Sequence, residues 1–243
     1  LSDDAQAEQL VQQYNDKLQK ILDEDMGEEL VDRKVQDPPK GAAATMDTSV
    51  DIEHLYDIND GIEEALDGFN FYSTRFKKTI LARRDLEDPT AKNIDWAGAE
   101  EFAFATILSE GISIRMTGQD CERGTFSHRH AVLHDAKSGR KLAPLQQIKQ
   151  AKAAFEIHNS PLSEEAALGF EYGYNVAAPE RLVIWEAQYG DFVNGAQNII
   201  DEFILSAREK WGLTPSLVML LPHGHEGAGP DHSSARPERF LAM

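Results

Sequence analysis

The sequence predicts an α/β fold whose mostly parallel sheet is covered by helices on both faces and follows an acidic, mainly helical N-terminal extension. From Asp95 onward, short apolar runs typical of strands alternate with longer stretches typical of helices. This alternation is typical of parallel sheets with crossover helices. Residues 1–93 are instead strongly acidic and contain few strand-like runs. We therefore expect a helical connecting segment with a linker at 1–93 and an α/β domain at 94–243.

In the first segment, a helical period of apolar residues predicts an amphipathic helix that starts near Ser2. The residues that make this period are Ala7, Leu10, Val11, Tyr14, Leu18, Ile21 and Leu22. Gly27 and Pro38-Pro39 are expected to close it, and the Ala/Thr/Asp-rich residues 40–52 to form a linker or exposed loop. A second helical piece is expected at roughly 59–87, before Pro89.

In the second segment, the predicted elements follow one another with short loops between them. Asp95 is a good N-cap for an apolar helix that stops at Gly111, and Ser163 is a good N-cap for a helix at 164–177. Further helices are expected at 193–209 and from about 232. Strands are expected at 112–116, 155–157, 182–185 and 216–221, and a hairpin at 131–134 and 141–143.

Composition and charge exclude several classes of function. The chain of 243 residues has 42 acidic and 24 basic side chains and a net charge of −18. Nucleic acid and anionic membranes would be repelled, so neither is expected as a partner. No run of 18 apolar residues and no signal peptide is found. The single cysteine, Cys121, fits a reducing compartment. Because the chain starts at Leu1 and ends within an expected helix, we expect a piece of a longer protein.

The unusual residues concentrate in loops that follow predicted strands, where ligands of such sheets bind. In the loop at 117–130, His128 and His130 match no zinc spacing, so no metal site is predicted and a plain polar loop is an alternative. In the loop at 160–165, Glu164 is explained either by helix capping and the helix dipole or by a role in a cleft.

Two further loops contain aromatic residues, glycines and histidines. The aromatic residues at 185–192 can stack on a flat heterocycle or belong to the core. The loop at 222–236 contains three glycines and three histidines between a strand and a helix. Glycines allow the backbone to approach a ligand closely, and this loop is therefore expected to be functional. It is not a phosphate-binding P-loop, because no Gly-Lys-Ser/Thr follows.

Taken together, the loops resemble one family, the E1 component of the 2-oxoglutarate dehydrogenase complex. The resemblance covers about residues 93–243 and rests on the strings GQDCERGTFSHRHAVLHD, LSEEAALGFEYGY, IWEAQYGDFVNGAQNIIDEF and VMLLPHGHEGAGPDHSSARPERF. It implies a transketolase-like pyrimidine-binding domain, truncated at its C-terminal end, and thiamine diphosphate as cofactor. The family's GDG-type motif is not found here, so Mg²⁺ is expected to be bound by a domain missing from this chain.

The resemblance also implies roles for individual residues. Glu164 matches the glutamate that hydrogen-bonds N1′ of the aminopyrimidine, which makes it both catalytic and cofactor-binding. Phe192 matches the aromatic residue that stacks on this ring, and Gln119 and Asp120 match a polar strand end near the cofactor. His232 matches a catalytic histidine on the substrate side. His128 and His130 are expected near the entrance of the active site, also on the substrate side.

The activity implied is oxidative decarboxylation of 2-oxoglutarate, with transfer of the succinyl group to the lipoyl group of the E2 dihydrolipoyl succinyltransferase. A homodimer is implied, located in the bacterial cytoplasm or in the mitochondrial matrix, and the piece alone is expected to be inactive. Two alternatives stay open: a non-catalytic relative that serves as a binding or scaffold module, and an enzyme for a related substrate such as 2-oxoadipate.

Overall fold

The computed structural model describes residues 4–25, 46–84, 86, 94–224, 229 and 232–242. The chain divides into two units, residues 1–36 and 37–243. The first contains helix α1 (Asp4–Asp25), whose apolar residues Leu10, Val11, Tyr14 and Leu18 are exposed. The amphipathic helix predicted at the N-terminus is therefore confirmed. Gly27, Pro38-Pro39, Pro89 and most of the predicted linker lie outside the described residues.

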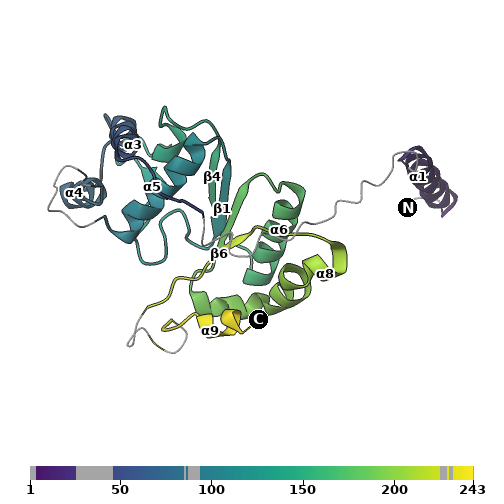
Figure 1. Ribbon diagram of the computed structural model, residues 1–243. Helices are drawn as coiled ribbons and strands as arrows, with labels where there is room; N and C mark the ends of the chain where they lie inside the picture. Colours follow the sequence, from purple (N-terminus) through teal and green to yellow (C-terminus); the bar gives the residue numbers. More distant parts are fainter. Residues whose placement is uncertain are drawn as a thin grey trace. The chain divides into compact units, whose positions relative to one another are not determined.

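The second unit is built on a four-stranded sheet with strand order β4-β1-β5-β6, in which all neighbours are parallel (Figure 1). The strands are β1 (Ile114–Gly118), β4 (Phe155–Asn159), β5 (Leu182–Glu186) and β6 (Val218–Leu220). In the register, Ile114 of β1 lies opposite Phe155 on one side and Leu182 on the other. The predicted parallel sheet is confirmed.

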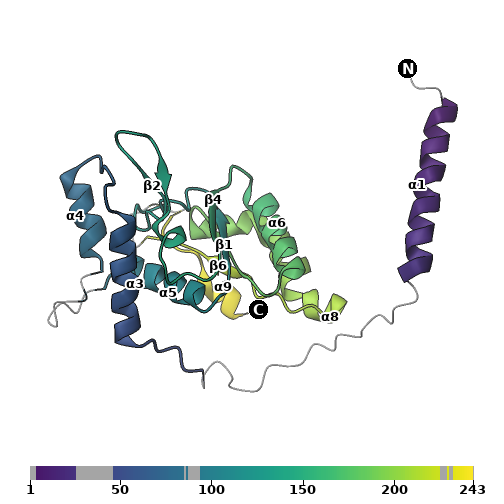
Figure 2. The ribbon, with the colours of Figure 1, turned by 90° about the horizontal axis from the view of Figure 1, so that it is seen from above.

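Helices cover both faces of this sheet, as Figures 1 and 2 show. On one face, Ile114, Met116 and Ile184 share a core with α5 (Trp96–Ser109) and with α3 (Ile52–Ala65). On the other face, Trp185 packs in a second core with α6 (Glu164–Ala177). Alternate residues of a strand point to opposite faces, which is why neighbouring residues of β5 belong to different cores.

Residues 59–87 do not form the one helix that was predicted. The region contains α3 and α4 (Thr74–Ala82), separated by a turn in which Gly68 has φ 72°. Helix α3 begins before residue 59 because the side chain of Asp51, within the expected linker, accepts a hydrogen bond from the amide of Glu53 over 3.0 Å. Such an N-cap satisfies a donor that the helix itself leaves unpaired.

The predicted helices at 193–209 and from 232 also differ from the structure. The first is broken into the 3₁₀ segment η2 (Gly190–Ala196), the short α7 (Gln197–Ile199), the π-helical η3 (Ile200–Leu205) and α8 (Ala207–Trp211). The last helix, α9, spans only Pro237–Leu241. Proline is favoured at the first helical position because its φ is fixed and its missing amide is not needed there.

The predicted hairpin is confirmed as β2 (Leu133–His134) and β3 (Lys141–Leu142), which pair antiparallel and precede the 3₁₀ segment η1 (Pro144–Gln146). Asp135 closes its turn, since one carboxylate oxygen accepts from the amides of Lys137 and Ser138 at 3.0 and 2.8 Å. The other accepts from the amide of Asn70 at 2.8 Å. Asp135 therefore ties the hairpin to the turn between α3 and α4.

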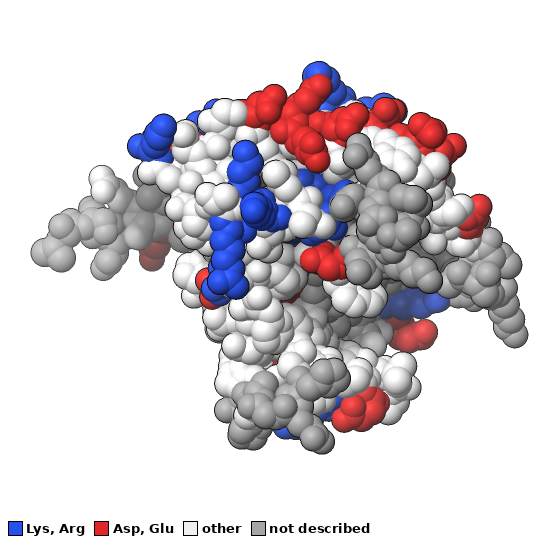
Figure 3. Space-filling view, turned by 90° about the vertical axis from the view of Figure 1, so that its left-hand side faces the viewer, with Lys and Arg blue, Asp and Glu red and all other residues white. Residues whose placement is uncertain are grey.

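Charges are unevenly distributed on the face that α3 and α4 present (Figure 3). Exposed acidic residues lie along α3 and its end, namely Glu53, Asp57, Asp60, Glu63, Glu64 and Asp67. The exposed basic residues Arg75, Lys77 and Lys78 lie on α4. Within the described part of the chain, no helix has the length and apolar character needed to cross a membrane.

Candidate functional site

The carboxyl ends of β1 and β5 lie in direct backbone contact. A Cβ atom placed on Gly118, the last residue of β1, would lie 2.1 Å from the carbonyl oxygen of Glu186, the last residue of β5. Such a distance is impossible for a real side chain, so only glycine allows the two ends to meet in this way. The loops that follow the two strands therefore start from neighbouring points, where polar side chains can converge.

Glu164 is the first residue of α6 and points to the end of β1. Its Oε1 accepts a hydrogen bond from Nε2 of Gln119 over 3.5 Å, and the same nitrogen donates to the carbonyl of Leu162 over 3.2 Å. The N-cap is Ser163, whose Oγ accepts from the amide of Ala166. Since Ser163 caps the helix, capping does not explain the side chain of Glu164.

The carboxylate of Glu164 is half-buried and retains one open oxygen. Among the hydrogen bonds of the described residues, none reaches Oε2 of Glu164. A Cβ on Gly195, in η2, would lie 3.7 Å from this atom. The absence of a side chain at residue 195 therefore keeps the space beside the carboxylate open.

A hollow of about 10 Å³ lies where these elements meet. Its lining residues are Gln119, Leu162, Glu164, Ala167, Trp185, Glu186 and Gln188. This volume is about that of one water molecule. Two carboxylates border it, but both oxygens of Glu186 accept hydrogen bonds from Arg129 at 2.7 Å. Of the two carboxylates, Glu164 is therefore the one with an oxygen that accepts no hydrogen bond from the described residues.

Asp120 follows Gln119 in a left-handed backbone conformation with φ 58°. Its Oδ2 accepts from Nε2 of Gln188 over 3.0 Å and lies 3.7 Å from a guanidinium nitrogen of Arg123. Aspartate tolerates this conformation better than most residues, because its short side chain hydrogen-bonds locally. The structure thus joins the loop after β1 to the loop after β5.

An aromatic cluster lies beyond the end of β5 and is centred on Tyr189. The ring centroid of Tyr189 lies 4.1 Å from that of His232, 5.6 Å from Phe192 and 5.9 Å from Phe126. Phe192 and His232 are 5.8 Å apart. Two residues that the sequence assigned to the site are thereby brought together. His232 lies ahead of α9 and not in its first turn, so it does not cap this helix.

His128 and His130 lie on the side of the loop that faces α4. The ring of His128 packs on Gly124, and its buried Nδ1 has no hydrogen-bond partner among the described residues. The ring of His130 contacts that of Phe76 at 4.8 Å and borders a pocket of about 330 Å³ that Asp120 also lines. Burial lowers the pKa of both histidines, which favours their neutral forms.

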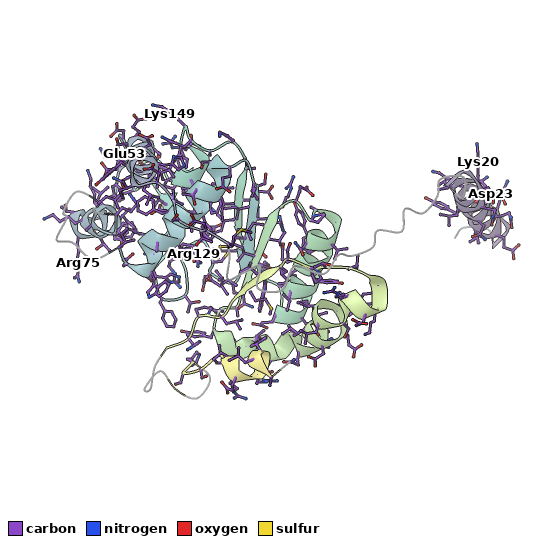
Figure 4. The ribbon with its side chains drawn as sticks, viewed as in Figure 1. Lys20, Asp23, Glu53, Arg75, Arg129 and Lys149 are labelled. Atoms are coloured by element: carbon purple, nitrogen blue, oxygen red, sulfur yellow. The ribbon has the colours of Figure 1, made fainter. Side chains whose placement is uncertain are left out.

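Sequence reasoning missed a buried ion pair between Arg129 and Glu186, whose side chains are 5% and 2% exposed. Figure 4 labels Arg129, which lies near α5. The signal available in the sequence was a glutamate that directly follows the apolar run of a buried strand, because such a charge requires a partner. In the described part of the chain, no group of three or more His, Cys, Asp or Glu side chains is arranged to hold a metal ion.

Comparison with known proteins shows the family of this chain. The family model described as the pyrimidine-binding domain of transketolase matches residues 92–243. The chain is 52% identical over 210 residues to the 2-oxoglutarate dehydrogenase E1 component of Bacillus cereus (strain B4264), a match that covers 86% of this chain and 22% of that protein. For the protein of the same name from Bacillus mycoides (strain KBAB4), identity is 54% over 198 residues, with 82% and 20% covered.

The chain thus spans about a fifth of the length of the curated relatives that it matches. The family match includes all four strands of the parallel sheet and the loops that contain Gln119, Glu164, Phe192 and His232. On this evidence, the chain belongs to the family of transketolase pyrimidine-binding domains.

Proposed function

We propose that this chain is the pyrimidine-binding part of a 2-oxoglutarate dehydrogenase E1 component. Its relatives of that name are more than half identical to it over most of its length. The observation that carries the proposal is the placement of Glu164. It is a half-buried carboxylate at the start of α6, hydrogen-bonded by Gln119 on one oxygen and open on the other.

The residues present suit the aminopyrimidine of thiamine diphosphate. The open oxygen of Glu164 can accept a hydrogen bond from a protonated ring nitrogen, and Gly195 leaves space beside it. Phe192 supplies a flat apolar surface within the aromatic cluster that also contains Tyr189 and His232. Flat heterocycles stack well on such rings. Carboxylate, glycine and aromatic ring come from α6 and η2, which pack against each other.

In the proposed reaction, bound thiamine diphosphate supplies the nucleophilic carbon and the electron sink for decarboxylation of a 2-oxo acid. Glu164 gives a proton to the ring nitrogen N1′ and takes it back, and partial burial suits that exchange. Gln119 orients the carboxylate, and Asp120 holds the neighbouring loop through Gln188. His232 contacts the 2-oxo acid, and His128 and His130 lie toward the substrate entrance.

The complete enzyme in this proposal contains more than these 243 residues. Residues 94–243 form the pyrimidine-binding domain and residues 1–93 connect it to a part that binds the diphosphate and Mg²⁺. The enzyme is a homodimer that oxidatively decarboxylates 2-oxoglutarate and passes the succinyl group to the lipoyl group of the E2 dihydrolipoyl succinyltransferase. It acts in the bacterial cytoplasm, or in the mitochondrial matrix of a eukaryote.

The test is an assay of the full-length protein with thiamine diphosphate and Mg²⁺. CO₂ release is measured from 2-oxoglutarate, 2-oxoadipate and pyruvate in parallel, and binding of thiamine diphosphate is measured by calorimetry. We expect binding and a kcat/KM that is highest for 2-oxoglutarate. A preference for 2-oxoadipate would change the substrate, whereas absence of both binding and CO₂ release would favour a non-catalytic binding module.

A further inference from the structure

The guanidinium of Arg129 uses all five of its N–H donors inside the protein. Nη1 and Nη2 each donate to one carboxylate oxygen of Glu186 at 2.7 Å. Nε and Nη2 donate to the two oxygens of Glu100, and Nη1 also donates to the carbonyl of Cys121 over 2.9 Å. Five donors are the full capacity of arginine. The side chain of Arg129 therefore has one defined position.

These hydrogen bonds join three elements at the edge of the candidate site. Glu186 is the last residue of β5, and Glu100 lies on α5. Cys121 directly follows Asp120 in the loop after β1, so the hydrogen bond to its carbonyl fixes the backbone beside Gln119 and Asp120. Arg83, at the end of α4, adds a hydrogen bond over 2.6 Å to the carbonyl of Arg129 itself.

Stability alone is a weak explanation for this arrangement. Burying charges costs solvation, and apolar residues of similar size often replace a buried ion pair without loss of stability. What apolar residues cannot replace is the direction of the hydrogen bonds. The network determines where the backbone at Cys121 lies relative to the end of β5, and hence where the amides of Gln119 and Gln188 point.

The neighbouring hydrogen bonds extend this geometry to the proposed catalytic carboxylate. Gln188, two residues after Glu186, donates to Asp120 over 3.0 Å. Gln119, the residue that directly precedes Asp120, donates to Glu164 over 3.5 Å. A continuous path of contacts therefore runs from Arg129 to Glu164. It passes through the loops that follow β1 and β5.

We propose that Arg129 is a positioning residue that holds the loop after β1 against the end of β5 and thereby sets the pose of Gln119 and Glu164 toward the aminopyrimidine. This inference rests on the proposed function. The five donors of Arg129 all go to protein groups, so it acts through Cys121, Glu186 and their neighbours.

The test compares Arg129→Lys and Arg129→Met with matched variants of Arg84 in the full-length protein. Arg84 is an equally buried arginine, 1% exposed at its side chain, and it pairs with Glu101, the neighbour of Glu100 on α5. Its other partner is Asn59 of α3, away from the strand ends. Arg84→Met therefore removes a similar buried pair without touching the loop after β1.

Four quantities are measured: the melting temperature, the Kd for thiamine diphosphate, the kcat for 2-oxoglutarate, and the rate at which a thiol reagent labels Cys121. The last is followed on the peptide that contains Cys121, by mass spectrometry, and needs no cofactor. Cys121 is fully buried and its carbonyl is held by Arg129, so labelling reports opening of this loop.

We expect Arg129→Met to label faster at Cys121, to bind thiamine diphosphate more weakly and to lower kcat by about 10²-fold, the scale that a misplacement of about 1 Å can cost. Arg129→Lys keeps the charge but loses the planar guanidinium that donates to both oxygens of a carboxylate. Its labelling rate, Kd and kcat should therefore lie between those of the wild type and of Arg129→Met. Arg84→Met should lower the melting temperature and leave labelling and Kd close to those of the wild type.

Equal labelling and equal Kd in the Arg129 and Arg84 variants would overturn the positioning role. If Arg129→Met does not fold, the comparison of Arg129→Lys with Arg84→Lys decides in the same way. A wild-type protein that does not bind thiamine diphosphate would contradict the proposed function instead. In that case, Cys121 labelling still tests whether Arg129 holds the loop.

Discussion

The side-chain amide of Gln119 donates to Oε1 of Glu164 over 3.5 Å and joins the end of β1 to the first turn of α6. The next glutamate along the chain, Glu165, has a different partner, since its Oε1 accepts from Nδ2 of Asn198 over 2.7 Å. Two adjacent glutamates of one helix therefore face different surroundings. This difference makes them a natural pair for separating catalysis from helix stability.

We expect Glu164→Gln to lower kcat for 2-oxoglutarate in the full-length enzyme by about 10²–10⁴-fold, the usual contribution of a general acid/base. The amide is nearly isosteric but cannot exchange a proton with the aminopyrimidine. Steady-state kinetics and the melting temperature, measured on the same preparation, check this prediction.

The matched control is Glu165→Gln, which removes the same charge from the same helical turn. It should retain near-normal kcat, because Glu165 lies toward α7 and not toward β1. If Glu164→Gln stayed active while Glu165→Gln did not, the proton-exchanging residue would be Glu165.

For His232, we expect replacement by alanine to lower kcat/KM for 2-oxoglutarate much more than it weakens binding of thiamine diphosphate. The imidazole lies 4.1 Å from the ring of Tyr189, in a loop whose backbone is held by a hydrogen bond from the amide of Gly224 to the carbonyl of His232. The position of His232 is thus fixed by its backbone and by ring contacts. Its imidazole nitrogens can therefore hydrogen-bond a substrate.

His223→Ala is the control from the same loop, since His223 is exposed and hydrogen-bonds only to the nearby carbonyl of Leu221 among the described residues. It should leave kcat/KM almost unchanged. A lower melting temperature of His232→Ala with unchanged kcat/KM would show that His232 serves packing against Tyr189 and would remove it from the site.

Elements whose local signals agree were predictable from the sequence. Helix α6 has the bounds that were predicted, because Ser163 caps it and an apolar period follows. The parallel sheet followed from short apolar runs separated by helices. Helix α3 was misplaced, because the Ala/Thr/Asp-rich residues 40–52 were interpreted as a linker although Asp51 is an N-cap.

The irregular region after β5 and the buried ion pair were not predictable in the same way. The periodicity of 193–209 is helical, but the 3₁₀ segment of 7 residues and the π segment of 6 residues are too short for their different residues per turn to stand out in the sequence. Arg129 and Glu186 are 57 residues apart in the sequence. Only the parallel pairing of β1 with β5 brings the two together, and no local pattern contains that information.

We expect Asp135 to make the stability of the domain depend on pH in the acidic range. Hydrogen bonds from the backbone of Ser138 and of Asn70 hold the pKa of this carboxyl well below its usual range. Because the pKa of Asp135 is lower in the folded than in the unfolded chain, the stabilisation is fully present above the unfolded pKa of about 3.9. It is lost as the pH falls from there through the folded pKa. We expect Asp135→Asn to lower the melting temperature at pH 7.

The difference in melting temperature between wild type and Asp135→Asn should narrow as the pH is lowered below about 4, because the unfolded wild-type chain then binds a proton at Asp135 that the folded chain does not. Asp60→Asn, at an exposed position on α3, should change the melting temperature little at any pH. A difference that is constant from pH 7 to pH 3 would mean that the charge of Asp135 does not stabilise the turn.

The isolated chain of 243 residues should release no CO₂ from 2-oxoglutarate, even with thiamine diphosphate and Mg²⁺ present. It offers Glu164, Gln119 and the aromatic cluster for the pyrimidine, whereas the proposed diphosphate-binding part belongs to the longer protein.

Folding of the isolated chain is checked through Cys121. Burial raises the pKa of this thiol to about 12, so at pH 8 a thiol reagent should label it slowly in buffer and quickly in urea. The full-length protein in the same assay is the positive control. CO₂ release by the isolated chain, with Cys121 protected, would show that the pyrimidine-binding domain alone supports the reaction.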